Sequence, residues 1–314
     1  MDTVERSEGT RGPAAIILTP TRELAVQITE ELHSFNGGKR LGIVTVYGGQ
    51  SISLQLKSLK KGADIIVGTP GRVIDFVNKG HLVLDDVKYA VLDEADEMLN
   101  MGFIEDVEYI LSHTPAEKRM LMFSATMPKR LQFIAEKFMK NVKTVKVISG
   151  ELTTALVDQK AFLVQAKDRQ QTLDRLICLE RDFYGIIFTQ TRMDAEHVSA
   201  RLQDKGHSVE FLHGDIPQKL REGILANFKQ KRIRILVATD VAARGIDVND
   251  LTHVINYSVP ESPEAYVHRI GRTGRAGREG NAFTLVIPSE RGRIERVRKT
   301  TKAAIPFTDV PAAT

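Results

Sequence analysis

Clustered carboxylates follow an apolar run in the segment YAVLDEAD, residues 89–96. An Asp at the tip of a strand, here Asp93, can hold Mg²⁺ through water because that ion keeps part of its hydration shell. The next carboxylate, Glu94, can orient or deprotonate an attacking water molecule. The same residues also suit an acidic helix N-terminus, where carboxylates interact favourably with the helix dipole. Taken alone, the segment leaves both interpretations open.

A second candidate site is rich in arginine and glycine. The segment HRIGRTGRAGR, residues 268–278, combines His268 with four arginines. Arginine matches phosphate by its fork geometry and keeps its charge. An arginine delivered to a nucleotide from another domain accelerates phosphoryl transfer by about 10³–10⁵. A generic basic loop is the weaker alternative, and the segment ATDVAARGID, residues 238–247, offers further polar groups after an apolar run.

Three segments of the first half combine a tight turn with a hydroxyl group, backbone amides or an arginine. They are PTREL (20–24), YGG (47–49) and TPGR (69–72). Such groups suit phosphate contacts through backbone N–H groups and helix N-termini. Each alone is equally an ordinary strand–helix turn, but three at one sheet edge predict a phosphate-binding track. FSAT (123–126) also ends an apolar run, where a helix cap before Pro128 is the simpler interpretation.

Apolar runs that alternate with amphipathic stretches predict parallel sheets covered by helices on both faces. In the first half, we expect strands at 14–18, 43–47, 64–68, 89–93, 121–123 and 144–148, and helices at 21–35, 52–61, 71–80 and 129–139. In the second half, we expect strands at 160–165, 184–189, 208–213, 234–238, 252–257 and 281–287. The fold class is therefore α/β, with domains at 1–148 and 157–314 and a polar linker at 149–156. Polar groups at the carboxyl ends of the strands are expected to form the sites.

Composition and charge narrow the class of protein. The 314 residues fit two domains, and 42% are apolar, which is enough for packed cores. The apolar runs are too short to span a bilayer, and the acidic start does not resemble a secretory signal. The single cysteine, Cys178, favours a reducing, cytoplasmic setting, and we expect it to be a small core residue. The sequence contains no Cys/His cluster, so we predict no zinc site.

The net charge of +4 is unevenly distributed. Residues 269–302 contain ten Lys or Arg and three Glu, and such a basic cluster predicts a polyanionic partner. For residues 291–302 alone, a solvated helix face is the preferred interpretation.

In order and spacing, these segments resemble the motifs of the DEAD-box family of ATP-dependent RNA helicases. Their residues are most similar to those of the bacterial cold-shock branch. The resemblance runs from about residue 14 to 311. It rests on PTRELA (20–25), GG (48–49), TPGR (69–72), DEAD (93–96), SAT (124–126), QKLR (218–221), ATDVAARGID (238–247) and HRIGRTGR (268–275).

The resemblance implies two RecA-like domains, ATP and Mg²⁺ as cofactors, and RNA bound mainly through its backbone. Asp93 would hold Mg²⁺ through water, and Glu94 would position the attacking water. Asp96, Ser124 and Thr126 would couple this site to the second domain through His268. The nucleotide would meet Gly245, Asp247 at the ribose, and the arginine fingers Arg272 and Arg275. In the first domain, the residues that contact RNA would be Thr21, Arg22, Gly49, Thr69, Gly71 and Arg72. In the second domain, Gln218, Arg221 and Thr239 would contact RNA or support the residues that do.

Two departures from the family pattern limit this prediction. The family needs a P-loop of the form GxxxxGK[ST], but the one Gly-Lys pair, Gly38-Lys39, is followed by Arg40. We therefore expect an N-terminally truncated chain with little or no ATPase activity alone. Because the P-loop strand is expected inside the first sheet, two apolar strand edges would be open. The milder departure is Ser258, where the family usually has Asp.

Two other functions remain open. A non-catalytic RNA-binding module derived from a helicase would keep the RNA track without the nucleotide site. The retention of Asp93, Glu94, Arg272 and Arg275 argues against it. A DNA-acting relative is the third possibility, and 2′-hydroxyl contacts would distinguish it.

Overall fold

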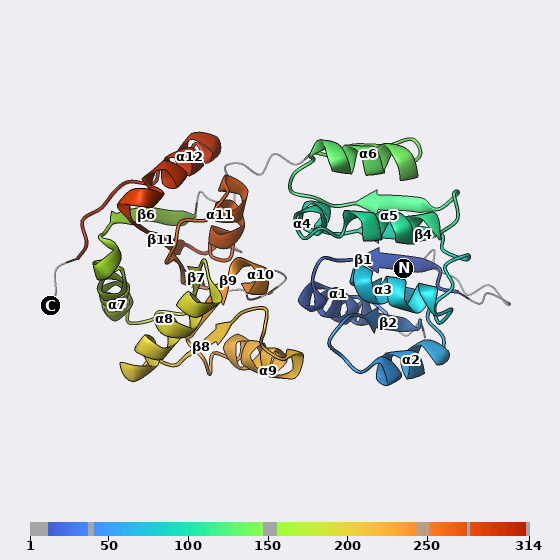
Figure 1. The fold of residues 1–314 in the computed structure, drawn as a ribbon, viewed down its shortest axis with the longest axis horizontal. Coiled ribbons are helices and arrows are strands. Elements are labelled where there is room, and N and C mark those ends of the chain that lie inside the picture. Colours follow the sequence, from blue (N-terminus) through green and yellow to red (C-terminus); the bar gives the residue numbers. More distant parts are fainter. Residues whose placement is uncertain are drawn as a thin grey trace. The chain divides into compact units, whose positions relative to one another are not determined.

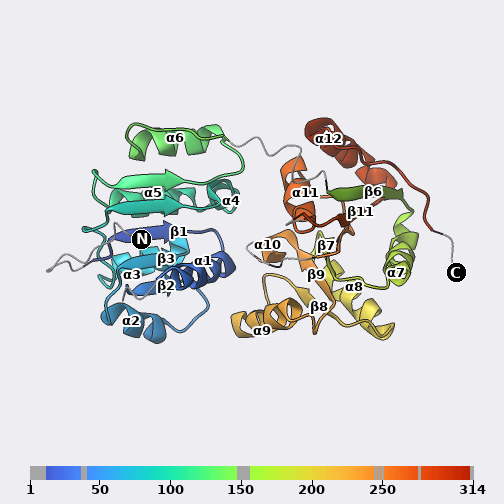
Figure 2. The same ribbon diagram turned by 180° about the vertical axis from the view of Figure 1, so that it is seen from behind.

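The computed structural model describes residues 12–36, 41–146, 156–243, 246, 248, 251–274 and 277–311 (Figure 1). The chain divides into two compact units, Met1–Val145 and Lys146–Thr314. Each unit is a parallel β-sheet with helices on its faces, as Figures 1 and 2 show. Most of the expected linker, residues 149–155, lies outside the described part of the chain.

The first unit contains a five-stranded sheet in the order β2-β3-β1-β4-β5, and every pairing is parallel. The strands are β1 (Ala15–Leu18), β2 (Ile43–Val46), β3 (Ile65–Gly68), β4 (Tyr89–Leu92) and β5 (Arg119–Met122). The helices are α1 (Arg22–Ser34), α2 (Ile52–Lys60), α3 (Pro70–Asn78), α4 (Ala95–Asn100), α5 (Ile104–Ser112) and α6 (Lys129–Phe138). All strands therefore end at the same edge of the sheet.

Apolar side chains divide this sheet into two unequal faces. On one face, Ile16 and Ile66 pack with residues of α3, α5 and α6, such as Phe76, Val107 and Leu131. On the other face, helix α1 packs over β1, β2 and β3. Alternation along short buried strands and helical spacing between them account for both sets of contacts.

Strand β5 lies at an edge and pairs only with β4 among the described strands. The register places Ile17, Val91 and Leu121 in one row across β1, β4 and β5. Leu121 is 39% exposed and the adjacent Phe123 is 54% exposed, because α1 does not extend over this half of the face. The described strands form one continuous sheet, and β5 is an edge strand that carries exposed apolar side chains. The expectation of a P-loop strand inside the sheet stays a prediction.

The expected strand at 144–148 is also wrong where the structure describes it. Residues 142–146 have no regular structure, and Val145 is 86% exposed. These residues have no neighbouring strand to pair with, and a segment of alternating apolar residues forms a stable strand only when it is paired. The other strands expected in this half are confirmed to within two residues.

The second unit contains a six-stranded parallel sheet in the order β6-β11-β10-β7-β9-β8. The strands are β6 (Val157–Leu163), β7 (Gly185–Thr189), β8 (Val209–Leu212), β9 (Ile235–Thr239), β10 (His253–Asn256) and β11 (Gly280–Val286). The helices are α7 (Arg169–Leu179), α8 (Arg192–Asp204), α9 (Gln218–Lys229), α10 (Asp240–Ala243), α11 (Pro263–Ile270) and α12 (Arg291–Thr301). Short 3₁₀ turns lie at Ala166–Asp168 and Pro288–Glu290.

Helices cover both faces of the second sheet. Helices α7 and α8 pack on one face, while α9 and α10 cover the β7–β9 part of the other. Helices α11 and α12 pack over β6 and β11 through Tyr266, Ile270, Ile294 and Val297. All six strands expected here are confirmed, with shifts of up to three residues.

The expected burial of Cys178 is wrong. Cys178 is exposed on α7 and is not a core residue, because the buried positions of that helix are Thr172, Leu173, Asp174, Leu176 and Ile177. Within the described residues, no helix is long and apolar enough to cross a membrane. The cytoplasmic setting stays a prediction.

Candidate functional site

The end of β4 places two carboxylates at the edge of the first sheet. Asp93 follows the last strand residue, and its Oδ1 accepts a hydrogen bond of 3.0 Å from the backbone N–H of Glu94. Burial raises the pKa of Asp93 above its ordinary value, and the Glu94 hydrogen bond only partly opposes this shift. Glu94 itself has left-handed backbone angles, φ 48° and ψ 50°, at the start of α4. A bound cation would offset the cost of burying the Asp93 charge.

Asp96, Ser124 and Thr126 form a closed set of hydrogen bonds. The Asp96 N–H donates to Ser124 Oγ at 3.1 Å, and Ser124 Oγ donates to the Thr126 carbonyl at 2.6 Å. The backbone N–H and the hydroxyl of Thr126 both donate to Asp96 Oδ2, at 2.8 and 2.9 Å. The hydroxyl groups of 123–126 thus bind the acidic segment and do not cap α6, which begins after Pro128 without a side-chain cap.

The segment after β1 begins the expected phosphate track. Thr21 is buried and caps α1 by accepting the Leu24 N–H at 3.3 Å. The guanidinium of Arg22 lies against Gly49, where a Cβ atom would be 2.4 Å from Arg22 Nη1. Gly49 also has φ +85°, so both its backbone and its lack of a side chain are required there. The structure therefore brings PTREL and YGG together.

The segment after β3 lies beside them. The backbone N–H of Thr69 donates to the Val46 carbonyl at 3.0 Å, which joins the ends of β3 and β2. Gly71 is exposed, and a Cβ atom there would meet nothing within 4 Å. Arg72 donates to the Gln50 carbonyl at 3.4 Å. Hydroxyl, amide and guanidinium groups from three loops thus share one edge, as the sequence predicted.

In the second unit, the residues expected to line RNA have different surroundings. Gln218 begins α9 and donates to Glu222 Oε1 at 3.1 Å. Arg221 is buried and donates to the Ala242 carbonyl, so it fixes α9 against α10. Thr239 is a buried residue at the carboxyl end of β9. The structure therefore supports a holding role for Arg221.

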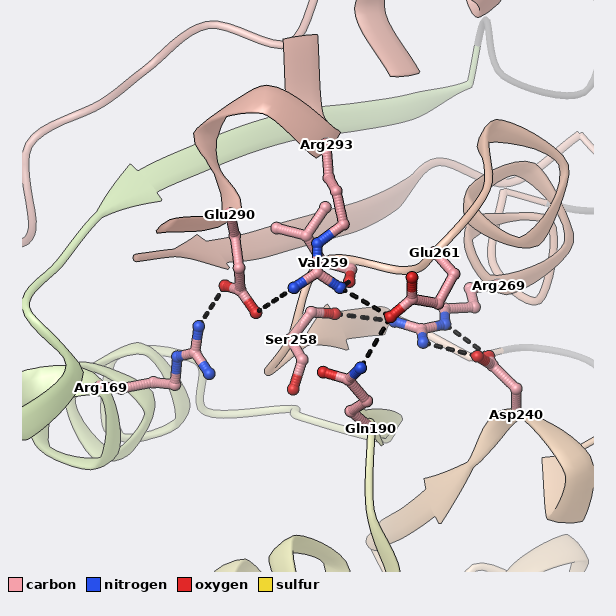
Figure 3. A network of polar contacts seen from close by, with 9 residues as sticks. All are labelled: Arg169, Gln190, Asp240, Ser258, Val259, Glu261, Arg269, Glu290 and Arg293. Atoms are coloured by element: carbon pink, nitrogen blue, oxygen red, sulfur yellow. Dashed lines mark hydrogen bonds and ion pairs between the residues drawn. The ribbon is translucent and has the colours of Figure 1, made fainter. Parts of the chain in front are cut away.

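Arg269 joins the carboxyl ends of β9 and β10 in the second unit. It is buried and binds Asp240 with two nitrogens, at 2.6 and 2.7 Å (Figure 3). It also donates to Asn256 Oδ1 at 3.0 Å and to the Ser258 carbonyl at 2.9 Å. From the sequence, Arg269 counted among four arginines that match phosphate and Asp240 had no role, but Arg269 is buried and binds protein groups. Their signal was an Asp directly after one strand and an Arg near the end of a later helix.

A second set of charges adjoins this one in Figure 3. Arg293 Nη1 donates to Glu261 Oε1 at 3.0 Å, and Gln190 donates to the same oxygen at 2.7 Å. Glu290 is buried between Arg169 and Arg293 and pairs with both. Sequence reasoning missed these residues because they lie in segments without a motif. They fix the loop that precedes α11.

The arginine-rich segment is described only in part. His268 lies near the end of α11 and is half-buried. Arg272 donates to the Ile246 carbonyl at 2.7 Å. Gly245, Asp247 and Arg275 lie outside the described residues.

Two family profiles match the chain along most of its length. The DEAD/DEAH box helicase profile matches residues 2–134, and the profile of the helicase conserved C-terminal domain matches residues 168–277. A DEAD-box protein of the hyperthermophile Methanococcus jannaschii is 45% identical, with 98% of this chain and 83% of that one covered and a TM-score of 0.54. The chain belongs to the DEAD-box helicase family.

Other relatives extend the comparison. The DEAD-box ATP-dependent RNA helicase CshA of Geobacillus kaustophilus is 48% identical over 92% of this chain, which spans 62% of that relative's length. Dbp5 of S. cerevisiae, solved with RNA and ADP BeF3, is 30% identical, with 96% and 78% of the chains covered and a TM-score of 0.83. Mss116p, solved with ssRNA and AMP-PNP, is 27% identical, with 98% and 66% covered and a TM-score of 0.86. The tandem α/β sheets are thus RecA-like domains.

Proposed function

We propose that this DEAD-box chain carries most of the machinery of an ATP-dependent RNA helicase, which opens short duplexes by closing two domains on ATP and RNA. The observation that carries the proposal is the hydrogen-bonded set of Asp96, Ser124 and Thr126 directly beside Asp93 and Glu94. Relatives solved with RNA and nucleotide support it.

Asp93 fits a magnesium ion that is held mainly by water and phosphate. Among the described residues, no group of three or more His, Cys, Asp or Glu side chains could hold a metal, so no all-protein cage is formed. Magnesium commonly uses one or two carboxylates together with substrate phosphates. When bound, it would neutralise charge on the phosphates. Glu94 would position the attacking water and accept its proton.

The second domain would complete the site on closure. Arg272 and Arg275 would contact the γ-phosphate, Asp247 the ribose, and Gly245 would lie near the nucleotide. The Arg272 bond to the Ile246 carbonyl would then be exchanged for a bond to phosphate. His268 would contact the hydrogen-bonded set of Asp96, Ser124 and Thr126 and so couple this set to the second domain. Loss of phosphate would remove the charge that holds the domains together.

RNA would bind along the strand ends of both domains. In the first domain, the exposed Gly49 and Gly71 leave backbone amides accessible, and Arg22 and Arg72 lie beside them. In the second domain, Gln218 and Thr239 would lie near the strand, and Arg221 would support them. Contacts of this kind recognise the backbone, so we expect little sequence preference.

The 314 residues contain no GxxxxGK[ST] segment, so we expect weak or no ATP turnover by the chain alone. A P-loop is a strand, a loop and a helix. The edge of β5 and the uncovered row at Leu121 offer a place for such a strand and helix. We expect a chimera that begins with a P-loop strand, a GxxxxGK[ST] loop and its helix to restore turnover.

The experiment compares RNA-stimulated ATP hydrolysis by the chain and by the chimera. We expect turnover only in the chimera, and loss of that turnover in its Glu94→Gln variant. Robust turnover by the chain alone would contradict the need for a P-loop. A chimera that binds RNA with the same affinity with and without AMP-PNP would favour a non-catalytic RNA-binding module.

A further inference from the structure

Helix α12 turns some of its basic residues inward and others outward. Its inward residues Ile294 and Val297 are buried in the core of the second unit. The half-buried Arg293 binds Glu261 and pairs with Glu290 (Figure 3). Arg298 binds Glu295 at 2.8 Å and the Ile305 carbonyl. These two arginines are neutralised by their own structural partners.

The outward side is different. Arg291, Arg296, Lys299 and Lys302 are exposed, and we call them the α12 basic face. In the part of the chain that the structure describes, no ion pair involves any of these four side chains. Glu295 is the one carboxylate of the helix itself, and it is already bound to Arg298. The face therefore carries uncompensated positive charge.

An aromatic ring lies beside this face. Phe307 is 36% exposed, and the guanidinium carbons of Arg298 and Arg291 lie 4.2 and 5.8 Å from its ring centroid. Hydrogen bonds of 2.9 Å on either side of Phe307 join its segment to Ala161 of β6. The ring is thus held in place by the sheet.

We propose that the α12 basic face, with Phe307, binds the backbone of an RNA strand that continues beyond the helicase track. This inference rests on the proposed function, since the track must hold the first part of the same strand. Helix α12 packs on α11 through buried apolar residues, within the same unit that carries the track residues Gln218 and Thr239.

The chemistry of the face favours RNA over a protein partner. Stable protein interfaces need an apolar or aromatic anchor at their centre, surrounded by a polar rim. Phe307 is the one exposed large hydrophobic side chain beside the face, and none is exposed on the described residues of α12, so the face lacks the apolar centre of a stable protein interface. Single-stranded RNA needs cations for its phosphates and an accessible ring for a base, and the face supplies both.

The test is a fluorescence anisotropy titration with 5′-fluorescein oligouridylates of about 8 and about 24 nucleotides, at several salt concentrations. The test variant is Arg296→Gln with Lys299→Gln. The matched control is Lys57→Gln with Lys60→Gln, two exposed lysines of α2 in the first unit. For the long RNA, we expect several-fold weaker binding and a salt slope smaller by about 1.4, which is 0.7 for each lost phosphate contact.

The short RNA and the control variant should show no change. Phe307→Leu should weaken binding of the long RNA even at high salt, because stacking is not screened. Equal losses for both RNA lengths, or none for either, would overturn the proposal. Displacement of only the long RNA by polyglutamate would assign the face to an acidic protein instead.

The same titration separates this inference from the proposed function. Arg72→Gln should weaken binding of the short RNA, since Arg72 belongs to the track. If Arg72→Gln changes nothing while Arg296→Gln with Lys299→Gln still weakens the long RNA, the α12 basic face binds RNA but the strand does not continue from the proposed track, so the proposed function fails at the track.

Discussion

At the scale of single residues, Asp96 is the centre of the hydrogen-bonded set in the first domain. Asp96→Ala removes the acceptor for both donors of Thr126. Because Asp96 is buried but Thr126 is exposed, we expect the free energy of unfolding to fall by about 1–2 kcal/mol. Urea unfolding followed by circular dichroism measures it. Asp85→Ala, at an exposed turn, is the control and should have little effect.

His253 gives the second domain a predictable dependence on pH. It is buried, stacks on Phe183 at 4.8 Å and approaches Glu180 at 3.6 Å and Asn281 at 3.2 Å. Burial lowers the pKa of His253 below 6.5, and Glu180 only partly opposes the shift. As pH falls through about 6.5, the unfolded chain gains a proton that the folded chain does not, so the free energy of unfolding decreases.

The variant His253→Gln should therefore lose less stability than the wild type between pH 7 and pH 5. Urea unfolding at several pH values measures the difference, with the exposed His197→Gln as the control. Parallel pH curves for the wild type and His253→Gln would show that the buried imidazole is not the cause.

The positions of some site residues could be predicted from the sequence because the adjacent segments of the chain determine where they lie. Asp93 comes directly after an apolar run, so the strand positions it. Arg269 could not be placed in this way. Its partner Asp240 directly follows β9 and its partner Asn256 ends β10, and only the folded sheet brings both to Arg269. Arg221 is buried for the same reason, since α10 accepts its hydrogen bond.

At the scale of elements, short runs of apolar residues located the strands but not their neighbours. Eleven strands form where runs were recognised, because a buried strand must be apolar along its own length. The run at 144–148 has the same pattern and remains without a partner in its described part. Strand order depends on contacts far apart in sequence, so the edge position of β5 had to come from the structure.

The open edge of β5 predicts self-association. Edge strands with exposed apolar side chains pair readily with other chains. Leu121→Lys should reduce association at high concentration, measured by sedimentation velocity, and change the free energy of unfolding by less than about 1 kcal/mol. Leu220→Lys, at an exposed leucine of α9, is the matched control. If both variants reduce association equally, added charge and not the edge is responsible.

At the scale of the whole molecule, the proposed chemistry needs residues from both domains. In the chimera with a P-loop, Arg275→Ala should lower ATP turnover by about 10³-fold, because the arginine would stabilise charge on the transferred phosphate. RNA affinity should change by only a few-fold. Parallel kinetic and binding assays measure both, with Arg181→Ala at an exposed turn as the control. Equal losses in turnover and RNA affinity would refute the finger assignment.

The left-handed backbone at Glu94 lowers the stability of the fold, whereas the proposed chemistry needs the Glu94 carboxylate. A non-glycine residue in this region costs about 1–2 kcal/mol, so glycine would stabilise the turn. Glycine would also remove the carboxylate that is proposed to activate water. Selection for heat resistance alone would therefore enrich Gly at position 94 and yield robust but inactive descendants. A laboratory lineage that keeps Glu94 at high temperature would show that it was selected for turnover as well.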